Sequence, residues 1–93
     1  MEKEIASLYD WVEYKLRRAE VEAAMGCLRA AEAWHRNAAH VAQFWLRETR
    51  LNVFDGWKEL KPDLRQKYEF LMRTAGYPLP TPRRRVEVMD EWA

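Results

Sequence analysis

The sequence has few residues that break helices and almost none that could form disulfides. It contains three glycines and four prolines, and three of those prolines, Pro78, Pro80 and Pro82, lie in one short stretch. The rest of the chain therefore favours helices strongly. The single cysteine, Cys27, excludes an internal disulfide, and the sequence shows neither a secretory leader nor an apolar run of about 20 residues. A cytoplasmic protein is expected.

The sequence also lacks an excess of charge of either sign. Its 16 basic and 15 acidic residues leave a formal net charge of +1, which argues against a strong electrostatic field for nucleic acid or membrane surfaces. Apolar residues make up 48% of the chain, so disorder is also not expected. A chain of 93 residues fits one domain, and a domain this small gains additional burial by forming oligomers.

The first half of the chain has a long helical pattern. No proline occurs between Glu2 and Glu48, and apolar or small residues recur from Ile5 onward with the period of an α-helix. An unbroken helix of that length would extend about 70 Å, so it either folds back near Gly26 or near His35, or stays whole and pairs with a second chain. Because neither point has a proper cluster of turn residues, we favour the unbroken or merely kinked helix.

This apolar stripe is the predicted surface for self-association. Its middle consists of small residues and its ends of bulky ones, which suits close antiparallel packing of two helices. The residues expected to make the contact are Leu8, Val12, Leu16, Ala23, Ala30, Trp34, Val41 and Trp45. Beside the stripe, Trp11 widens the apolar arc toward Tyr14, which indicates a second contact surface.

The second half of the chain predicts a connector, a shorter helix and an extended tail. Asp55 is expected to cap a short turn that carries Trp57. Pro62 suits a first helical position and Gly76 a helix C-cap, so a helix is expected over about 62–75. The fold class is therefore all-α: a small helical bundle built from a long N-terminal helix or helical hairpin, this capped helix and an extended tail. Residues 1–77 form the helical domain, and 78–93 form a proline-rich, basic C-terminal arm.

The sequence contains no strong motif for catalysis or for a cofactor. Glu32 and His35 have the spacing of a carboxylate metal site, which a dimer would have to complete, and Arg29 with His35 has a spacing used by some helical ribonucleases. Each pair occurs once, and ordinary exposed residues on a helix explain both better. Ser7 is the only serine and lies far from either histidine in the sequence. A non-enzymatic protein without cofactor or metal is expected.

The C-terminal arm has the composition of a docking segment. A proline spacer leads to a basic triplet and then to residues typical of interface anchors. Together with one connector residue, the predicted partner-binding residues are Trp57, Arg83, Arg84, Arg85, Met89 and Trp92.

These patterns favour a helical protein–protein interaction module that forms a homodimer or larger oligomer and binds a further, unidentified protein. An adaptor, an accessory subunit, an assembly chaperone and a phage-type regulator or inhibitor all fit this description. The alternative is a small nucleic-acid-binding or regulatory module that uses the basic triplet, residues 83–85. A dimeric metal-carboxylate protein around Glu32 and His35 is a third, weaker hypothesis.

Overall fold

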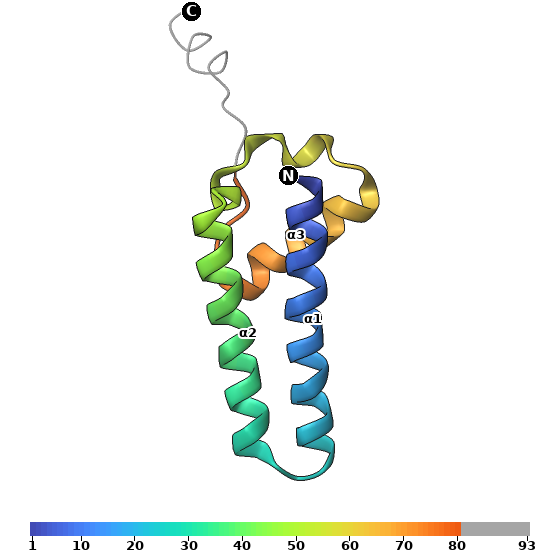
Figure 1. Cartoon of the computed structure of the whole chain (residues 1–93), viewed down its shortest axis with the longest axis vertical. Helices are drawn as coiled ribbons and strands as arrows, with labels where there is room; N and C mark the ends of the chain where they lie inside the picture. The colour runs from blue at the N-terminus through green and yellow to red at the C-terminus, as the bar shows by residue number, and fades with distance from the viewer. Residues whose placement is uncertain (81–93) are drawn as a thin grey trace, which may run out of the picture.

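The computed structural model describes residues 1–80, which form three α-helices and two short 3₁₀ helices. Two long helices, α1 (Glu2–Ala24) and α2 (Leu28–Glu48), lie antiparallel as a hairpin (Figure 1). The connector contains η1 (Leu51–Val53) and η2 (Asp55–Glu59), and the third helix is α3 (Pro62–Ala75). The predicted all-α bundle is confirmed, with the hairpin in place of a single long helix.

The unbroken helix that we favoured from the sequence is wrong, because α1 ends in a tight turn at Gly26. The Cys27 amide donates to the Glu22 carbonyl at 2.8 Å and the Gly26 amide to that of Ala23 at 3.0 Å, which is the Schellman arrangement of a helix end. Gly26 has φ of +84°, a left-handed conformation that other residues adopt only with strain. One glycine is thus enough to reverse the chain without a cluster of turn residues.

The turn also changes which residues of α2 face α1. The buried residues of α2 are Ala31, Ala38, Ala42 and Leu46, whereas the stripe extended from α1 pointed to Ala30 and Trp45. The periodicity of α1 cannot be extended into α2, because residues 25–27 belong to neither helix and reset the direction in which each residue of α2 points. The alanines let the two backbones approach closely, so the antiparallel partner of α1 is α2 of the same chain.

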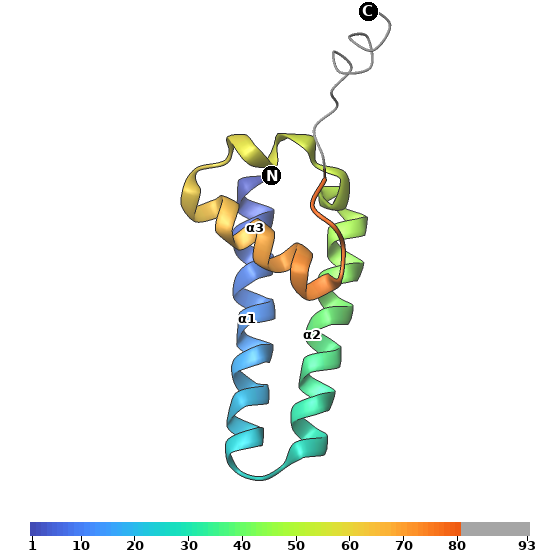
Figure 2. The same cartoon turned by 180° about the vertical axis from the view of Figure 1, so that it is seen from behind.

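Helix α3 closes the core on one side of the hairpin (Figure 2). It begins at Pro62 and ends at Gly76, where the Tyr77 amide donates to the Met72 carbonyl at 2.9 Å, so both predicted ends are confirmed. Its buried face contributes Tyr68, Leu71, Met72 and Ala75 to a core shared with the open ends of α1 and α2. The turn end of the hairpin extends beyond α3 (Figure 1).

The connector is held to α3 by two aromatic residues. The Tyr68 hydroxyl donates to the Leu51 carbonyl, and the Trp57 ring stacks on Tyr68 with 6.0 Å between ring centroids. The Trp57 indole donates in turn to the Pro80 carbonyl at 2.7 Å, which fixes the chain where it leaves α3. The predicted cap at Asp55 is wrong: η2 has no side-chain cap, and its aromatic contacts hold it in place instead.

The Gly26 turn gives a first prediction on stability. Gly26→Ala is expected to lower the free energy of unfolding by about 1–2 kcal/mol, because an L side chain resists this positive φ. A Cβ at Gly26 would meet no atom within 4 Å, so the effect reports backbone strain and not a clash. Urea unfolding of both Gly26→Ala and Gly26→Asn measures it; asparagine tolerates the left-handed region and should recover part of the loss. Equal stability of Gly26→Ala and the parent chain would contradict this role of the turn.

Burial of Tyr68 predicts a specific sensitivity to alkali. Burial raises the pKa of Tyr68 from 10.0 to about 12, and the nearby Asp55 carboxylate acts in the same direction. Because the pKa is raised on folding, the stabilisation is complete below about pH 10 and is lost as the pH rises through about 12. Ionisation of Tyr68 should therefore lower the free energy of unfolding by up to about 2.7 kcal/mol over this pH range.

The matched test is Tyr68→Phe against Tyr14→Phe, an exposed tyrosine. At neutral pH, Tyr68→Phe should cost about 1 kcal/mol for the lost hydrogen bond. Between pH 9.5 and 11.5, the free energy of unfolding from urea titrations should fall less steeply for Tyr68→Phe than for the parent chain. Tyr14→Phe should keep the parent's steep fall, and identical pH slopes for all three proteins would refute the assignment to Tyr68.

Candidate interaction surface

One face of the α1–α2 hairpin is left uncovered by α3. On the covered side, the Tyr9 ring packs edge-on against Phe70 of α3 at 5.3 Å, and the Gln43 side chain donates to the Ala75 carbonyl at 2.7 Å. Trp11 and Trp45 each follow one of these α3-facing residues by two positions, which places them about 200° further around their helices. Both tryptophans therefore lie on the side of the hairpin opposite α3.

We call this side the free face and define it by its aromatic and basic side chains: Trp11, Lys15, Arg18, Trp34 and Trp45. The Lys15 ammonium lies between two indole rings, 5.4 Å from the centroid of Trp11 and 5.5 Å from that of Trp34. The Arg18 guanidinium lies 5.6 Å from the Trp34 ring and also pairs with Glu22 at 3.0 Å. Each such cation–π contact stabilises by about 0.5–1 kcal/mol at an exposed site, so the cluster holds its tryptophans in place.

Next to this cluster, the free face contains an apolar hollow of about 220 Å³ at the open end of the hairpin. The lining is almost entirely apolar, and the residues that form it are Glu4, Ser7, Leu8, Trp11, Trp45, Thr49 and Leu51. Of the two tryptophans at the hollow, Trp11 is 46% exposed and Trp45 is 40% exposed. Large exposed tryptophans around an apolar hollow are typical of protein docking sites.

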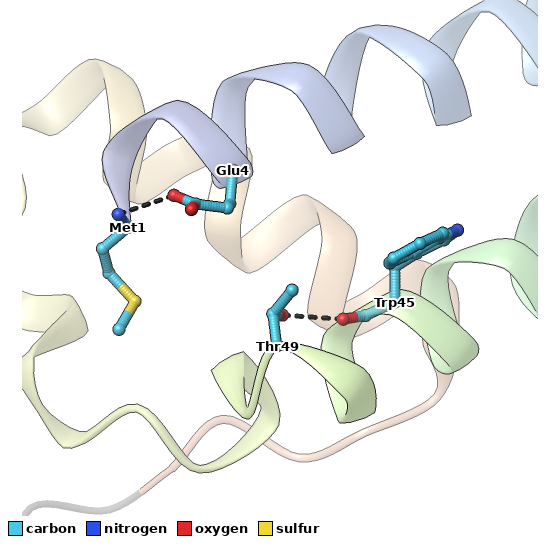
Figure 3. A network of polar contacts seen from close by, with 4 residues as sticks. All are labelled: Met1, Glu4, Trp45 and Thr49. Atoms are coloured by element: carbon cyan, nitrogen blue, oxygen red, sulfur yellow. Dashed lines mark hydrogen bonds and ion pairs between the residues drawn. The ribbon is translucent and has the colours of Figure 1, made fainter.

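Two polar side chains at the rim of the hollow, Glu4 and Thr49, have partners within the chain (Figure 3). The Met1 amine pairs with the Glu4 carboxylate at 2.6 Å, and the hydrogen bond from this amine holds the pKa of Glu4 below its usual value. The Thr49 hydroxyl donates to the Trp45 carbonyl at 2.7 Å. In Figure 3 the Trp45 ring lies between the ribbons of α2 and α1. An occupant of the hollow would therefore meet mainly apolar surface.

The residues predicted for self-association are divided between the core and the surface. Leu8 and Val12 are buried against the chain's own helices. Leu16, Ala30, Trp34 and Val41 are half-buried, while Ala23 and Trp45 are exposed. Trp34 and Trp45 thus belong to the free face.

The exposed Trp11 and Tyr14 were indicated as a second surface by their position beside the stripe. The Tyr14 ring packs edge-on against Trp34 at 6.3 Å, next to the cation–π cluster. Lys15 was missed, because a lysine near an apolar stripe gives no sign in the sequence that its ammonium will lie between two rings from different helices.

Of the predicted partner-binding residues, only Trp57 lies within residues 1–80. It is buried, and its indole holds Pro80, so in this structure it serves the fold. The other five residues lie outside the described part of the chain: Arg83, Arg84, Arg85, Met89 and Trp92.

The residues considered for metal binding or ribonuclease chemistry are dispersed on α2. Arg29, Glu32 and His35 are all exposed. Within residues 1–80, no three side chains of histidine, cysteine, aspartate or glutamate come together as metal ligands. None of the helices in that range combines the length and apolarity needed to cross a membrane.

Comparison with protein-family models, curated proteins and solved structures finds no significant match to this chain.

Proposed function

We propose that the protein is a non-enzymatic helical interaction module that self-associates through the free face. The observation that carries this proposal is that Trp11 and Trp45 border an apolar hollow on the side of the hairpin that α3 leaves uncovered. Exposed apolar patches bordered by polar groups mark interaction sites on proteins of this size. The polar rim at Glu4 and Thr49 fits this description.

A second copy of the chain is a suitable occupant of the free face because it supplies the layer that the hairpin lacks. Helical domains bury their apolar stripes by packing one layer of helices on another. Within residues 1–80, α3 supplies this layer over the open end of one side of the hairpin, and no helix supplies it on the free face. Two hairpins related by a two-fold axis would stack as four helices in a closed dimer.

The size of the free face is sufficient for such a dimer. A helix of the length of α1, 23 residues, extends about 35 Å, and two adjacent helices present a width of about 20 Å. The resulting face measures roughly 700 Å², close to the 800 Å² or so that each partner contributes to a stable interface. Tryptophan, which this face presents from both helices, is one of the residue types that dominate binding energy at interfaces.

Further roles follow as proposals from the sequence. The arm, residues 78–93, would bind a further protein, as in an adaptor, accessory subunit, assembly chaperone or phage-type regulator. Cytoplasmic location is supported by the exposed, unpaired thiol of Cys27, which suits a reducing compartment.

The test is the solution mass of the full chain, measured by light scattering at micromolar to millimolar concentrations. A mass that rises to twice the 11.2 kDa of one chain supports the proposal. A monomer over the whole range contradicts it. Repeating the measurement with excess duplex DNA and with RNA at low salt tests the alternative nucleic-acid function, which depends on residues 83–85.

A further inference from the structure

We propose that the indole edge of Trp57 is a binding site for proline-rich segments. The chain's own residues 78–80 occupy this site, and a proline-rich segment of a partner protein takes their place. Trp57 and residues 78–80 lie with α3 on the side of the hairpin opposite the free face, so this site is separate from the proposed self-association (Figure 2). Three features carry the proposal: the indole donor, the aromatic rings that support it and the weak hold on its present occupant.

The hydrogen bond from Trp57 to Pro80 is a contact that suits recognition of a proline-rich chain. The Trp57 indole N–H donates to the Pro80 carbonyl at 2.7 Å. Proline fixes φ at about −65° and has no amide hydrogen, so proline-rich segments favour the polyproline II conformation, whose carbonyls have no partner within the segment. A fixed donor among aromatic rings can bind such a segment through these carbonyls. Residues 78–82, Pro-Leu-Pro-Thr-Pro, have the required composition.

The aromatic support for Trp57 is complete without this segment. Trp57 stacks on Tyr68 with 6.0 Å between ring centroids, and Phe54 packs edge-on against Tyr68, also at 6.0 Å. The Tyr68 hydroxyl donates to the Leu51 carbonyl. These contacts join the connector to α3 and involve no residue beyond position 75, so the indole is held in place whichever segment lies against it. A donor that is fixed in advance loses less conformational freedom on binding.

The hold on the chain's own segment is weak enough for a partner to replace it. Within residues 1–80, no backbone hydrogen bond involves residues 78–80, and the contact from Trp57 to Pro80 is the one side-chain hydrogen bond that they make. Pro78 and Leu79 are exposed, and Pro80 is half-buried. A single net hydrogen bond favours the bound arrangement by only about fivefold.

A different protein is a better source of the replacing segment than a second copy of this chain. In a second copy the same segment is already held by its own Trp57, so exchange between two copies would form no contact that each copy lacks. A segment of another protein has no such contact to lose. Its chemistry is that of the present occupant: an extended, proline-rich chain that offers free carbonyls to the indole.

The chain's own segment acts as a tethered competitor in this arrangement. Because it is attached next to the site, it competes at a high effective concentration and lowers the apparent affinity for a partner. Pro78 and Pro80 do not belong to the hydrophobic core. Replacing both with alanine should therefore weaken the competitor and leave the site intact, so that a proline-rich partner binds more tightly.

Nuclear magnetic resonance of the full chain, at a concentration where it is monomeric, tests the proposal. The five tryptophan indole N–H signals are observed, and that of Trp57 is assigned by its absence in Trp57→Phe. The probe is a blocked Pro-Leu-Pro-Thr-Pro peptide at millimolar concentrations, and the control peptide is Ala-Leu-Ala-Thr-Ala. We expect only the proline peptide to shift the Trp57 signal. The double variant Pro78→Ala/Pro80→Ala should bind this peptide about three- to fivefold more tightly than the parent chain.

A tryptophan variant separates recognition from a structural role. Trp57→Phe keeps an aromatic ring against Tyr68 but lacks the N–H donor, so it should lose most of the binding, as followed by the peptide's own signals. The matched control is Trp11→Phe on the free face, which should bind the peptide as the parent chain does. Circular dichroism checks that both variants fold. If Trp57→Phe unfolds, the comparison of the double proline variant with the parent chain decides the result.

Several outcomes would overturn the inference. These are an unshifted Trp57 signal in both the parent chain and the double variant, an equal shift with the alanine peptide, and equal affinity of the two proteins for the proline peptide. If the unlabelled parent chain shifts the Trp57 signal of the labelled double variant as the peptide does, the occupant is a second copy, and the assignment to another protein is wrong. Self-association through the free face is tested separately by solution mass, so either proposal can fail while the other stands.

Discussion

Leu46→Ala is expected to lower the free energy of unfolding by about 2–5 kcal/mol, the largest effect on stability that we predict. Leu46 lies on α2, is fully buried, and belongs to the core that α1, α2, α3 and the connector share. Its removal would leave a cavity at this junction, which rigid helices fill only in part. Because small domains are stable by only about 5–15 kcal/mol, this loss would be a large part of the total.

The same substitution at an exposed position provides the control. Leu28 lies at the start of α2, at the turn end of the hairpin, and is 66% exposed. Leu28→Ala removes the same atoms from a helix and should change stability by less than about 0.5 kcal/mol. Urea unfolding followed by circular dichroism measures both variants. Similar losses at the two positions would show that the core does not lie where α3 crosses the hairpin.

Trp45→Ala and Trp11→Ala are each expected to weaken self-association by about 2 kcal/mol or more, which raises the dissociation constant of the dimer about 30-fold. Both side chains line the hollow and are nearly half exposed in one chain, so a second copy would bury them. Because they contribute little to the core, the isolated chain should remain folded. Sedimentation equilibrium at several protein concentrations measures the dissociation constant.

Two controls test whether weaker self-association results from a general loss of exposed apolar surface or from unfolding of the chain. Leu28→Ala removes a large exposed side chain away from the hollow and should leave the dissociation constant unchanged. Urea midpoints of the tryptophan variants, measured at a concentration where the parent chain is monomeric, should lie close to the parent value. Unchanged dissociation constants for both tryptophan variants would remove the free face as the site of self-association.

Local sequence signals predicted the structure correctly where a single residue type fixes the backbone conformation. Pro62 and Gly76 predicted both ends of α3, because proline suits the first helical turn and glycine the left-handed residue after the last. The apolar period predicted that Ile5, Leu8 and Val12 lie on the side of α1 that packs on another helix, although Leu8 and Val12 were assigned to self-association. Such signals act within a few residues and need no knowledge of the rest of the fold.

The choice between a hairpin and one long helix required the tertiary structure. Gly26 fits either form, since glycine is tolerated inside a helix at a penalty of about 1 kcal/mol. The hairpin is more stable because folding back lets the alanines of α2 pack on α1. Helix α3 then adds a core in which Leu46, Tyr68 and Leu71 are buried together. These contacts join residues that are far apart in the sequence, so their contribution to stability cannot be predicted from a local sequence pattern.

At the candidate site, too, some features could be predicted from the sequence and others required the tertiary structure. The sequence by itself determined that the chain is helical and where α3 begins and ends. Only the tertiary structure decided which tryptophans face outward. Position on a helix fixes the angle between two side chains, but whether Trp11 and Trp45 are covered depends on which side of the hairpin α3 packs. The pairing of α1 with α2 also brought Lys15 between Trp11 and Trp34, because that contact joins two helices.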